Sequence, residues 1–310
     1  MEEIAGGCFC CRFTSLLEAA EKLTRETRPD VFLAEPVGSC TDLVATVSYP
    51  LRRIYGDRFE IAPLSVLVDP SRAARILGLE NGRVFSEKVV YVYRKQLEEA
   101  DLIVVNKCDA LEPALRERLV EAIRQSFPRA EVFPASAKEG TGLDPWFSRV
   151  LENNAGDSTS LDLDYDLYAE GEAQLGWLNA SVRLSSPAPF DANQALVGLA
   201  RALRDRIAGA GHEIAHLKMT LDTEDGTGTL SVVSLVRSDG EPDLRESLLD
   251  RVDGGALVIN LRAEADPEFL ERAVREALEA LGIPAVMEHL ERFRPARPRP
   301  IHRMTGGAQS

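Results

Sequence analysis

The fold of this chain of 310 residues is decided by residues 102–109, which read Leu-Ile-Val-Val-Asn-Lys-Cys-Asp. Four apolar residues followed at once by polar ones are typical of a parallel strand that is covered on both faces and ends at a loop. Similar runs at 31–34, 64–68 and 131–133 alternate with stretches whose apolar residues recur at helical spacing. This alternation predicts a doubly wound, mostly parallel α/β sheet, with ligands bound beyond the carboxyl ends of its strands.

The composition of the chain narrows the class of protein. Hydrophobic residues make up 45% of the sequence, which is enough for a buried core and too many for a disordered chain. Asp and Glu number 50 against 36 Lys and Arg, and the net charge of −14 argues against nucleic acid and anionic membranes as partners. No apolar run approaches the roughly 20 residues of a membrane-spanning helix, and the first residues do not resemble a signal peptide. We therefore expect a cytoplasmic protein.

The loop after the 102–105 strand carries the first functional motif, Asn-Lys-Cys-Asp at 106–109. Asn-Lys-x-Asp at a strand end is the guanine-reading motif of GTPases, because its Asp carboxylate accepts two hydrogen bonds that guanine donates and adenine cannot. Residues 136–138, Ser-Ala-Lys, follow the next strand, where a backbone N–H would donate to guanine O6. Together the two motifs predict that guanine is bound by Asn106, Lys107, Asp109, Ser136, Ala137 and Lys138.

Residues 35–38, Glu-Pro-Val-Gly, follow the predicted 31–34 strand in the same way. A carboxylate at that place can hold a Mg²⁺-bound water or orient an attacking water, and a glycine lets the backbone approach a γ-phosphate. Glu35 and Gly38 are therefore the candidate catalytic residues. Taken alone, the motif is better explained by a plain carboxylate at a strand end before a turn.

A third motif lies near the N-terminus, where residues 6–11 read Gly-Gly-Cys-Phe-Cys-Cys. Three thiols within four residues are poorly spaced for a disulfide between them and well spaced to share one metal ion. Thiolates suit Zn²⁺, and Co²⁺ accepts similar tetrahedral sites. Cys8, Cys10 and Cys11 are therefore candidate ligands of Zn²⁺ or Co²⁺, and three buried structural cysteines are the alternative. Cys40 and Cys108 stand alone in the sequence and are predicted to be structural.

The order of these motifs resembles that of the CobW/HypB/UreG-type P-loop GTPases, and most closely the CobW (cobalamin-synthesis-like) branch, whose hallmark is the Cys-x-Cys-Cys loop. The similarity covers roughly residues 4–147 and includes the Gln-Leu pair at 96–97. It implies a metallochaperone or metal-insertion factor that uses GTP and Mg²⁺ and delivers a divalent metal to a client metalloprotein; a homodimer is compatible with it. It also implies that Glu35 and Gly38 form the Walker B and γ-phosphate-sensing segment.

The chain departs from this family at the phosphate-binding loop. Family members begin with a strand and Gly-x-x-Gly-x-Gly-Lys-Ser/Thr, whose backbone N–H groups and Lys hold the phosphates. No such stretch occurs in the 310 residues. Either the sequence is a fragment or the protein lacks this machinery, and in both cases we expect the chain alone to hydrolyse little GTP. A non-catalytic metal-binding or regulatory module is therefore the alternative function.

Four segments are predicted along the chain: a GTP-binding domain without its P-loop unit (1–150), an acidic linker (151–176), an α+β domain (177–295) and a basic Pro-rich tail (296–310). In the third segment, β-α-β-β…β-α-β order predicts a ferredoxin-like sheet with an extra strand. The linker lacks the Gly and the distal Glu of an EF-hand, so a solvated connector is expected rather than a Ca²⁺ loop. The arginines of the tail predict an extended segment along the acidic body.

Residues 212–216, His-Glu-Ile-Ala-His, match the zinc-peptidase signature His-Glu-x-x-His. That chemistry needs both histidines on one face of a helix, with the Glu reaching a zinc-bound water. From Ala215 to Leu221, however, apolar and polar residues alternate, which predicts a strand with one wet face. We therefore expect two surface histidines here rather than a peptidase site.

Overall fold

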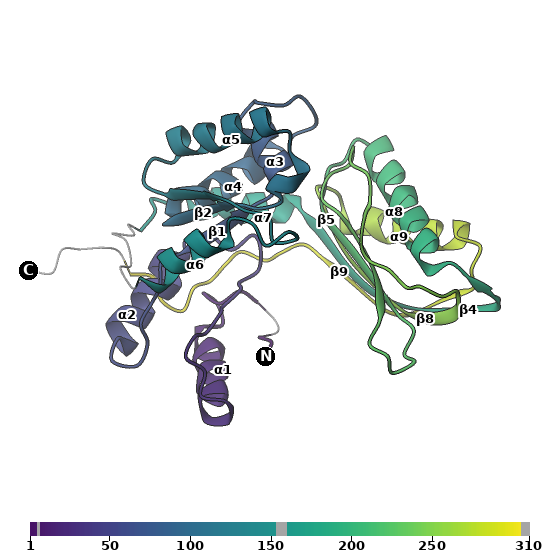
Figure 1. Cartoon of the computed structure of the whole chain (residues 1–310), viewed down its shortest axis with the longest axis horizontal. Coiled ribbons are helices and arrows are strands. Elements are labelled where there is room, and N and C mark those ends of the chain that lie inside the picture. Colours follow the sequence, from purple (N-terminus) through teal and green to yellow (C-terminus); the bar gives the residue numbers. More distant parts are fainter. Residues whose placement is uncertain (5–6, 153–159, 305–310) are drawn as a thin grey trace, which may run out of the picture. The chain divides into compact units, whose positions relative to one another are not determined.

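A computed structural model describes residues 1–4, 7–152 and 160–304 (Figure 1). The chain forms two compact units, one of residues 1–81, 87–169 and 297–310 and the other of residues 82–86 and 170–296. The fold is mixed α/β, with a parallel sheet in the first unit and an antiparallel sheet in the second. Within the described residues, no helix is both long and apolar enough to cross a lipid bilayer.

The sheet of the first unit has the order β1 (Ser65–Val68), β2 (Leu102–Val105), β3 (Glu131–Pro134), and all its strands are parallel. Every residue of the central strand β2 is buried, as its continuous apolar sequence predicted. The helical segments of this unit are α1 (Phe13–Glu26), the π-helical turn η1 (Val44–Ser48), α2 (Tyr49–Tyr55), α3 (Pro70–Ile76), α4 (Glu87–Glu99), the 3₁₀ turn η2 (Cys108–Ala110), α5 (Pro113–Ser126), α6 (Leu143–Leu151) and the start of α7 (Tyr165–Gln174).

The prediction of a buried strand at 31–34 was wrong. This stretch is irregular backbone, and the side chains of Val31 and Leu33 are 55% and 94% exposed. A run of apolar residues forms a strand only where a neighbour supplies backbone hydrogen bonds, and among the described residues β1 pairs with β2 alone. Glu35 therefore does not follow a strand.

The acidic stretch 151–176 holds more regular structure than a solvated connector would. Residues 153–159 lie outside the described residues, but α7 begins at Tyr165, and the side chains of Leu163 and Tyr168 are buried. The Tyr168 hydroxyl accepts a hydrogen bond from the backbone N–H of Thr41 at 3.2 Å. Tyr168 therefore ties the start of α7 to the rest of the first unit.

The sheet of the second unit is antiparallel, with the order β7-β6-β5-β8-β4-β9. Strands β9, β4, β8 and β5 with helices α8 and α9 reproduce the predicted ferredoxin-like order, and β6 and β7 extend the sheet beyond β5. Both helices lie on one face of the sheet and share a single core with it (Figure 1). The bounds are β4 (Gly176–Phe190), α8 (Ala192–Gly209), β5 (Ile214–Asp222), β6 (Leu230–Leu235), β7 (Asp243–Glu246), β8 (Val252–Ala263), α9 (Pro267–Ala280) and β9 (Ala285–Phe293).

Strand β7 had no signal in the sequence, because its four residues, Asp-Leu-Arg-Glu, are all exposed and mostly charged. The His-Glu-x-x-His stretch leads into β5 as predicted, not into a helix. The carboxylate of Glu213 is buried and accepts a hydrogen bond from the backbone N–H of Ser238 at 3.2 Å. This glutamate therefore has a structural partner, and the segment lacks the helical geometry that a zinc peptidase requires.

Candidate functional site

The three N-terminal cysteines lie together. Their Sγ atoms are separated by 2.8 Å (Cys8 to Cys10) and 3.6 Å (Cys8 to Cys11 and Cys10 to Cys11). The backbone N–H groups of Cys11 and Arg12 both donate to the carbonyl of Cys8, at 3.1 and 3.0 Å, so one tight turn precedes α1. That turn places all three thiols within reach of a single ion.

The thiols of this cysteine loop do not titrate alike. Hydrogen bonding to Cys10, and next to Cys40, holds the pKa of Cys8 far below its ordinary value. The hydrogen bond to Cys8, together with burial, raises the pKa of Cys10, and burial raises that of Cys11. These shifts favour ionisation of Cys8 over that of Cys10 and Cys11. A thiolate is the form of cysteine that binds metals, and the remaining protons would leave when an ion enters.

The C-terminal tail covers the cysteine loop, which the sequence did not indicate. The backbone N–H of Arg299 donates to Cys11 Sγ at 3.2 Å, and that of Ile301 donates to the carbonyl of Cys10 at 2.9 Å. The ring of His302 meets the ring of Phe13 edge-on, with centroids 5.0 Å apart. The predicted course of the tail along acidic residues is confirmed by ion pairs of Arg297 with Asp166 and of Arg303 with Asp42.

The two predicted guanine-reading loops meet at Asn106. Its side-chain oxygen accepts hydrogen bonds from the backbone N–H groups of Lys107 at 2.8 Å and Ala137 at 3.0 Å. The second loop is closed by a hydrogen bond from the backbone N–H of Ser136 to the carbonyl of Thr141 at 2.9 Å. Asp109, Ala137 and Lys138 are exposed, so the surface around this junction is open to solvent.

Asp69, which the sequence analysis missed, is the ionic partner of this junction. Its carboxylate lies 3.0 Å from Lys107 Nζ and also caps the start of α3 by accepting from the backbone N–H of Arg72. Burial would raise the pKa of Asp69, but the Lys107 ammonium and these hydrogen bonds outweigh it and lower the pKa. Asp69 directly follows β1, so inspecting every strand end would have found it.

Gly38 and Glu35 are placed differently from the prediction. Glu35 is exposed on irregular backbone, so no strand end positions its carboxylate. The carbonyl of Gly38 accepts a hydrogen bond from Gln96 Nε2 at 2.9 Å, and the same amide donates to the carbonyl of Cys40 at 3.0 Å. Gln96 of helix α4 therefore fixes residues 38–40, whereas neither of these hydrogen bonds involves Glu35.

A buried pair of carboxylates lies just beyond Cys40. The side chain of Asp42 is fully buried, and its Oδ2 accepts hydrogen bonds from Tyr165 and Arg303, each at 2.7 Å. Glu99, at the end of α4, accepts from the backbone N–H of Val44 at 3.2 Å. Burial, and after it the nearby Asp42 carboxylate, raises the pKa of Glu99 to about 8.

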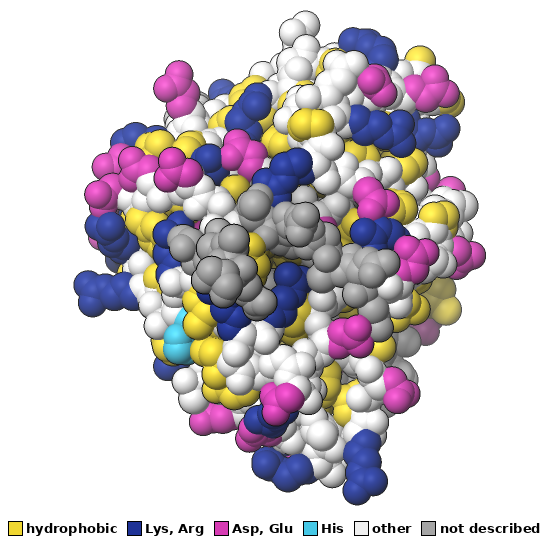
Figure 2. All heavy atoms as spheres, turned by 90° about the vertical axis from the view of Figure 1, so that its left-hand side faces the viewer, with side chains coloured by type: hydrophobic (Ala, Val, Ile, Leu, Met, Phe, Trp, Pro, Cys, Tyr) yellow, Lys and Arg dark blue, Asp and Glu magenta, His cyan; other side chains and the backbone are white. Residues whose placement is uncertain are grey.

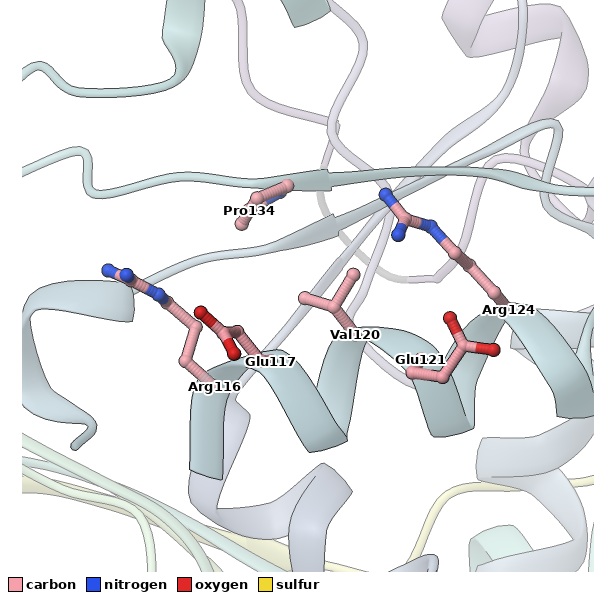
Figure 3. A pocket seen from close by; sticks show the side chains of 6 residues that line it. All are labelled: Arg116, Glu117, Val120, Glu121, Arg124 and Pro134. Carbon is pink, nitrogen blue, oxygen red and sulfur yellow. The ribbon is translucent and has the colours of Figure 1, made fainter. Parts of the chain in front are cut away.

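A shallow hollow of about 390 Å³ lies between α5 and the end of β3 (Figure 3). Its lining residues are Arg116, Glu117, Val120, Glu121, Arg124 and Pro134, and none of them belongs to a predicted motif. On the face shown in Figure 2, the described Lys and Arg side chains lie among Asp and Glu side chains rather than in one broad basic patch. The hollow therefore contains none of the residues of the cysteine loop or of the junction at Asn106.

Replacing Asn106 by alanine should lower the free energy of unfolding by about 1–3 kcal/mol, because two backbone N–H groups lose their acceptor. Urea denaturation of the wild type and the variant measures this loss. The variant Asn106→Asp keeps an oxygen at the junction and should retain most of the stability. Equal losses in both variants would show that the oxygen does not hold the two loops.

Comparison with known proteins supports these assignments unevenly. Residues 1–134 match the family described as CobW/HypB/UreG, nucleotide-binding domain. No curated protein matches the sequence significantly. Among solved structures, the chain is similar to the Zn(II)-bound YjiA GTPase from E. coli, with 16% identity over 77% of this chain and 67% of that chain and a TM-score of 0.27.

Two further solved structures are similar at the same low level. A Zn(II)-bound triple mutant of YjiA GTPase is 14% identical over 86% of this chain and 76% of that chain, with a TM-score of 0.29. A hydantoinase/carbamoylase family amidase from Burkholderia ambifaria is 17% identical over 51% and 40%, with a TM-score of 0.21. These scores are too low to carry an argument from structure, so the family match to residues 1–134 is the finding on which the assignment stands.

Proposed function

We propose that this chain, whose residues 1–134 belong to the CobW/HypB/UreG nucleotide-binding domain family, is a GTP-dependent metallochaperone of the CobW type. Its cargo would be Zn²⁺, or Co²⁺, held by Cys8, Cys10 and Cys11. Its recipient would be a client metalloprotein in the cytoplasm, and the chaperone could work as a homodimer. The observation that carries the proposal is the cluster of three thiols inside a nucleotide-binding domain.

Cargo binding is supported by the chemistry of the cysteine loop. Three sulfur atoms lie within 4.8 Å of one another, and hydrogen bonds from neighbouring cysteines lower the pKa of Cys8, which favours a thiolate there. Thiolates favour zinc and similar borderline metals over Mg²⁺ and Ca²⁺, which take oxygen ligands. The cysteine loop is therefore suited to a transition-metal cargo and not to the Mg²⁺ that accompanies GTP.

Guanine reading is supported by the junction at Asn106, which joins both predicted loops through one side-chain oxygen. Asp109 would accept hydrogen bonds from guanine, and the backbone N–H of Ala137, which donates to Asn106 Oδ1 in this structure, would have to turn to guanine O6 when the base binds. The 310 residues do not include a phosphate-binding loop, so the proposed function includes no hydrolytic step by this chain alone. Mg²⁺ and a role for Glu35 remain implications of the family.

The rival proposal is a metal-binding or regulatory module whose metal affinity ignores nucleotide. Titration of the chain with Zn²⁺ in the presence of a chelator, with and without GTP and Mg²⁺, separates the two. A chaperone should bind Zn²⁺ more tightly with GTP, and ATP should have no such effect because adenine cannot supply both hydrogen bonds to Asp109. The variant Asp109→Ala should lose the GTP response and keep Zn²⁺ binding. Unchanged zinc affinity with GTP would favour the rival.

A further inference from the structure

We propose that the tail segment 297–304 is part of the metal site: it binds the cysteine loop through backbone N–H groups and raises the affinity of the loop for its metal. The inference rests on the proposed metal-binding function. The N–H of Arg299 donates to Cys11 Sγ at 3.2 Å, and the N–H of Ile301 donates to the carbonyl of Cys10 at 2.9 Å. The tail segment therefore contacts the sulfur of one candidate ligand and the backbone of another.

The sequence of the tail segment suits it to this contact. Residues 298–301 read Pro-Arg-Pro-Ile, and proline has no backbone N–H, so only two of these four residues can donate a backbone hydrogen bond. Both of them donate to the cysteine loop. The prolines also restrict the backbone of the undocked segment, which lowers the conformational entropy lost when the segment docks.

Contacts outside the cysteine loop hold the tail segment in place. Arg303 donates to Asp42 Oδ2 at 2.7 Å, and the Asp42 side chain is fully buried. The backbone N–H of Met304 donates to the carbonyl of Ala45 at 2.8 Å. Because separating Arg303 from Asp42 would leave a buried charge without its partner, the segment stays docked without a metal. The two N–H donors are therefore in place beside the cysteine loop before an ion arrives.

The chemistry of a thiolate site gives these donors an effect on the metal. Zn²⁺ bound by three thiolates leaves an excess of negative charge on the sulfurs. A hydrogen bond from an N–H to a thiolate is charge-assisted, so the N–H of Arg299 binds Cys11 more strongly as a thiolate than as a thiol. Metal binding and docking of the tail segment must therefore strengthen each other, because the coupling between two binding events is reciprocal.

The alternative is a tail segment that blocks the cysteine loop and has to leave before a metal enters. Its contacts favour the first interpretation, since it offers N–H donors to the loop, and a sulfur that binds one ion keeps lone pairs that can still accept a hydrogen bond. A blocking segment predicts the opposite change in metal affinity when the contact is removed. One experiment therefore distinguishes the two.

Two variants at one position isolate the N–H donor. Arg299→Pro removes the N–H and keeps an extended backbone, since residue 299 already lies between two prolines. The matched control Arg299→Ala keeps the N–H and removes only the guanidinium. Competition with a chromophoric chelator should show that Arg299→Pro binds Zn²⁺ about 10- to 100-fold more weakly than Arg299→Ala does.

Cobalt reports on the sulfur itself. In the full chain loaded with one equivalent of Co²⁺, the sulfur-to-cobalt charge-transfer band should lie at lower energy in Arg299→Pro than in Arg299→Ala, because a hydrogen bond lowers the energy of the sulfur lone pairs. The variant Cys108→Ser should leave this band unchanged, since the Cys108 thiol is buried and donates to the carbonyl of Val105.

Trypsin provides a test that needs no variant. Trypsin cuts poorly before proline, so within the tail segment the bond after Arg303 is the one at which it should cleave. One equivalent of Zn²⁺ should slow this cleavage in the wild type, by a factor similar to the affinity lost in Arg299→Pro, because the coupling is reciprocal. The mass of the intact chain and of its product measures the rate.

Equal zinc affinities and equal cobalt bands in Arg299→Pro and Arg299→Ala would overturn the inference and leave the proposed metal function intact. Tighter zinc binding by Arg299→Pro would show that the tail segment blocks the loop, and would overturn it as well. If Arg299→Pro does not fold, a rate of cleavage after Arg303 that ignores zinc overturns the inference. Failure of the wild type to bind one equivalent of Zn²⁺ would refute the proposed function itself, and the inference with it.

Discussion

Replacement of Cys10 by serine should abolish stoichiometric Zn²⁺ binding. Cys10 is the most buried thiol of the cysteine loop, at 2% exposure, and its Sγ lies 2.8 Å from Cys8 and 3.6 Å from Cys11. A serine hydroxyl is a harder donor than a thiolate and keeps its proton at neutral pH, so it cannot replace the lost ligand. The buried hydroxyl would then face two sulfurs that can no longer enclose an ion.

Native mass spectrometry and competition with a chromophoric chelator measure this loss. We expect the wild type to retain one zinc and Cys10→Ser to retain none at chelator concentrations that leave Cys108→Ser loaded. Urea denaturation of the metal-free proteins shows whether the variant still folds, so that lost binding is separated from lost structure. A Cys10→Ser protein that folds and holds zinc as tightly as the wild type would contradict the assignment of the cysteine loop.

The parts of the fold that could be predicted are those whose signal lies within a short stretch of sequence. Strand β2 combines four buried apolar residues with a polar loop that follows it. Helices α8 and α9 each start at an Asp N-cap, whose side chain accepts a hydrogen bond from a backbone N–H in the first turn. The 31–34 run has the same apolar composition as a strand but remains irregular. The strand prediction failed there because a strand also needs a neighbouring strand to pair with, and that partner comes from residues far away in the chain.

The residues of the candidate site can be sorted in the same way, into those with a local signal in the sequence and those without one. The three cysteines and the two predicted guanine-reading loops are local patterns, and the folded chain brings the cysteines together and joins the two loops through Asn106. The contact of the Arg299 backbone with Cys11 joins residues 288 positions apart, and no local pattern encodes it. Asp69 differs from both cases, because it sits at a strand end and could have been found by asking which polar residues follow every predicted strand.

Replacement of Glu99 by glutamine should make the protein more stable at pH 8 while changing little at pH 5. Glu99 is buried beside the fully buried Asp42, and burial followed by that charge raises its pKa to about 8. In the unfolded chain a glutamate has a pKa of about 4.3, so between these values the folded state holds a proton that the unfolded state has lost. Wild-type stability relative to the glutamine variant must therefore fall as the pH rises from about 5 to about 8.

The expected slope is about 1.4 kcal/mol per pH unit over that window, which sums to a few kcal/mol, and the difference should level off above pH 8. Glutamine imitates the protonated acid, since its amide oxygen still accepts from the backbone N–H of Val44.

Urea denaturation of both proteins at several pH values gives the difference in the free energy of unfolding, in which contributions from all other titrating groups cancel. The neighbouring Glu98, which is exposed and paired with Lys95, supplies the matched control Glu98→Gln. A constant difference between wild type and Glu99→Gln from pH 5 to pH 8 would show that Glu99 is ionised in the folded protein. The folded protein would then bury the carboxylates of both Asp42 and Glu99, with the guanidinium of Arg303 paired to Asp42.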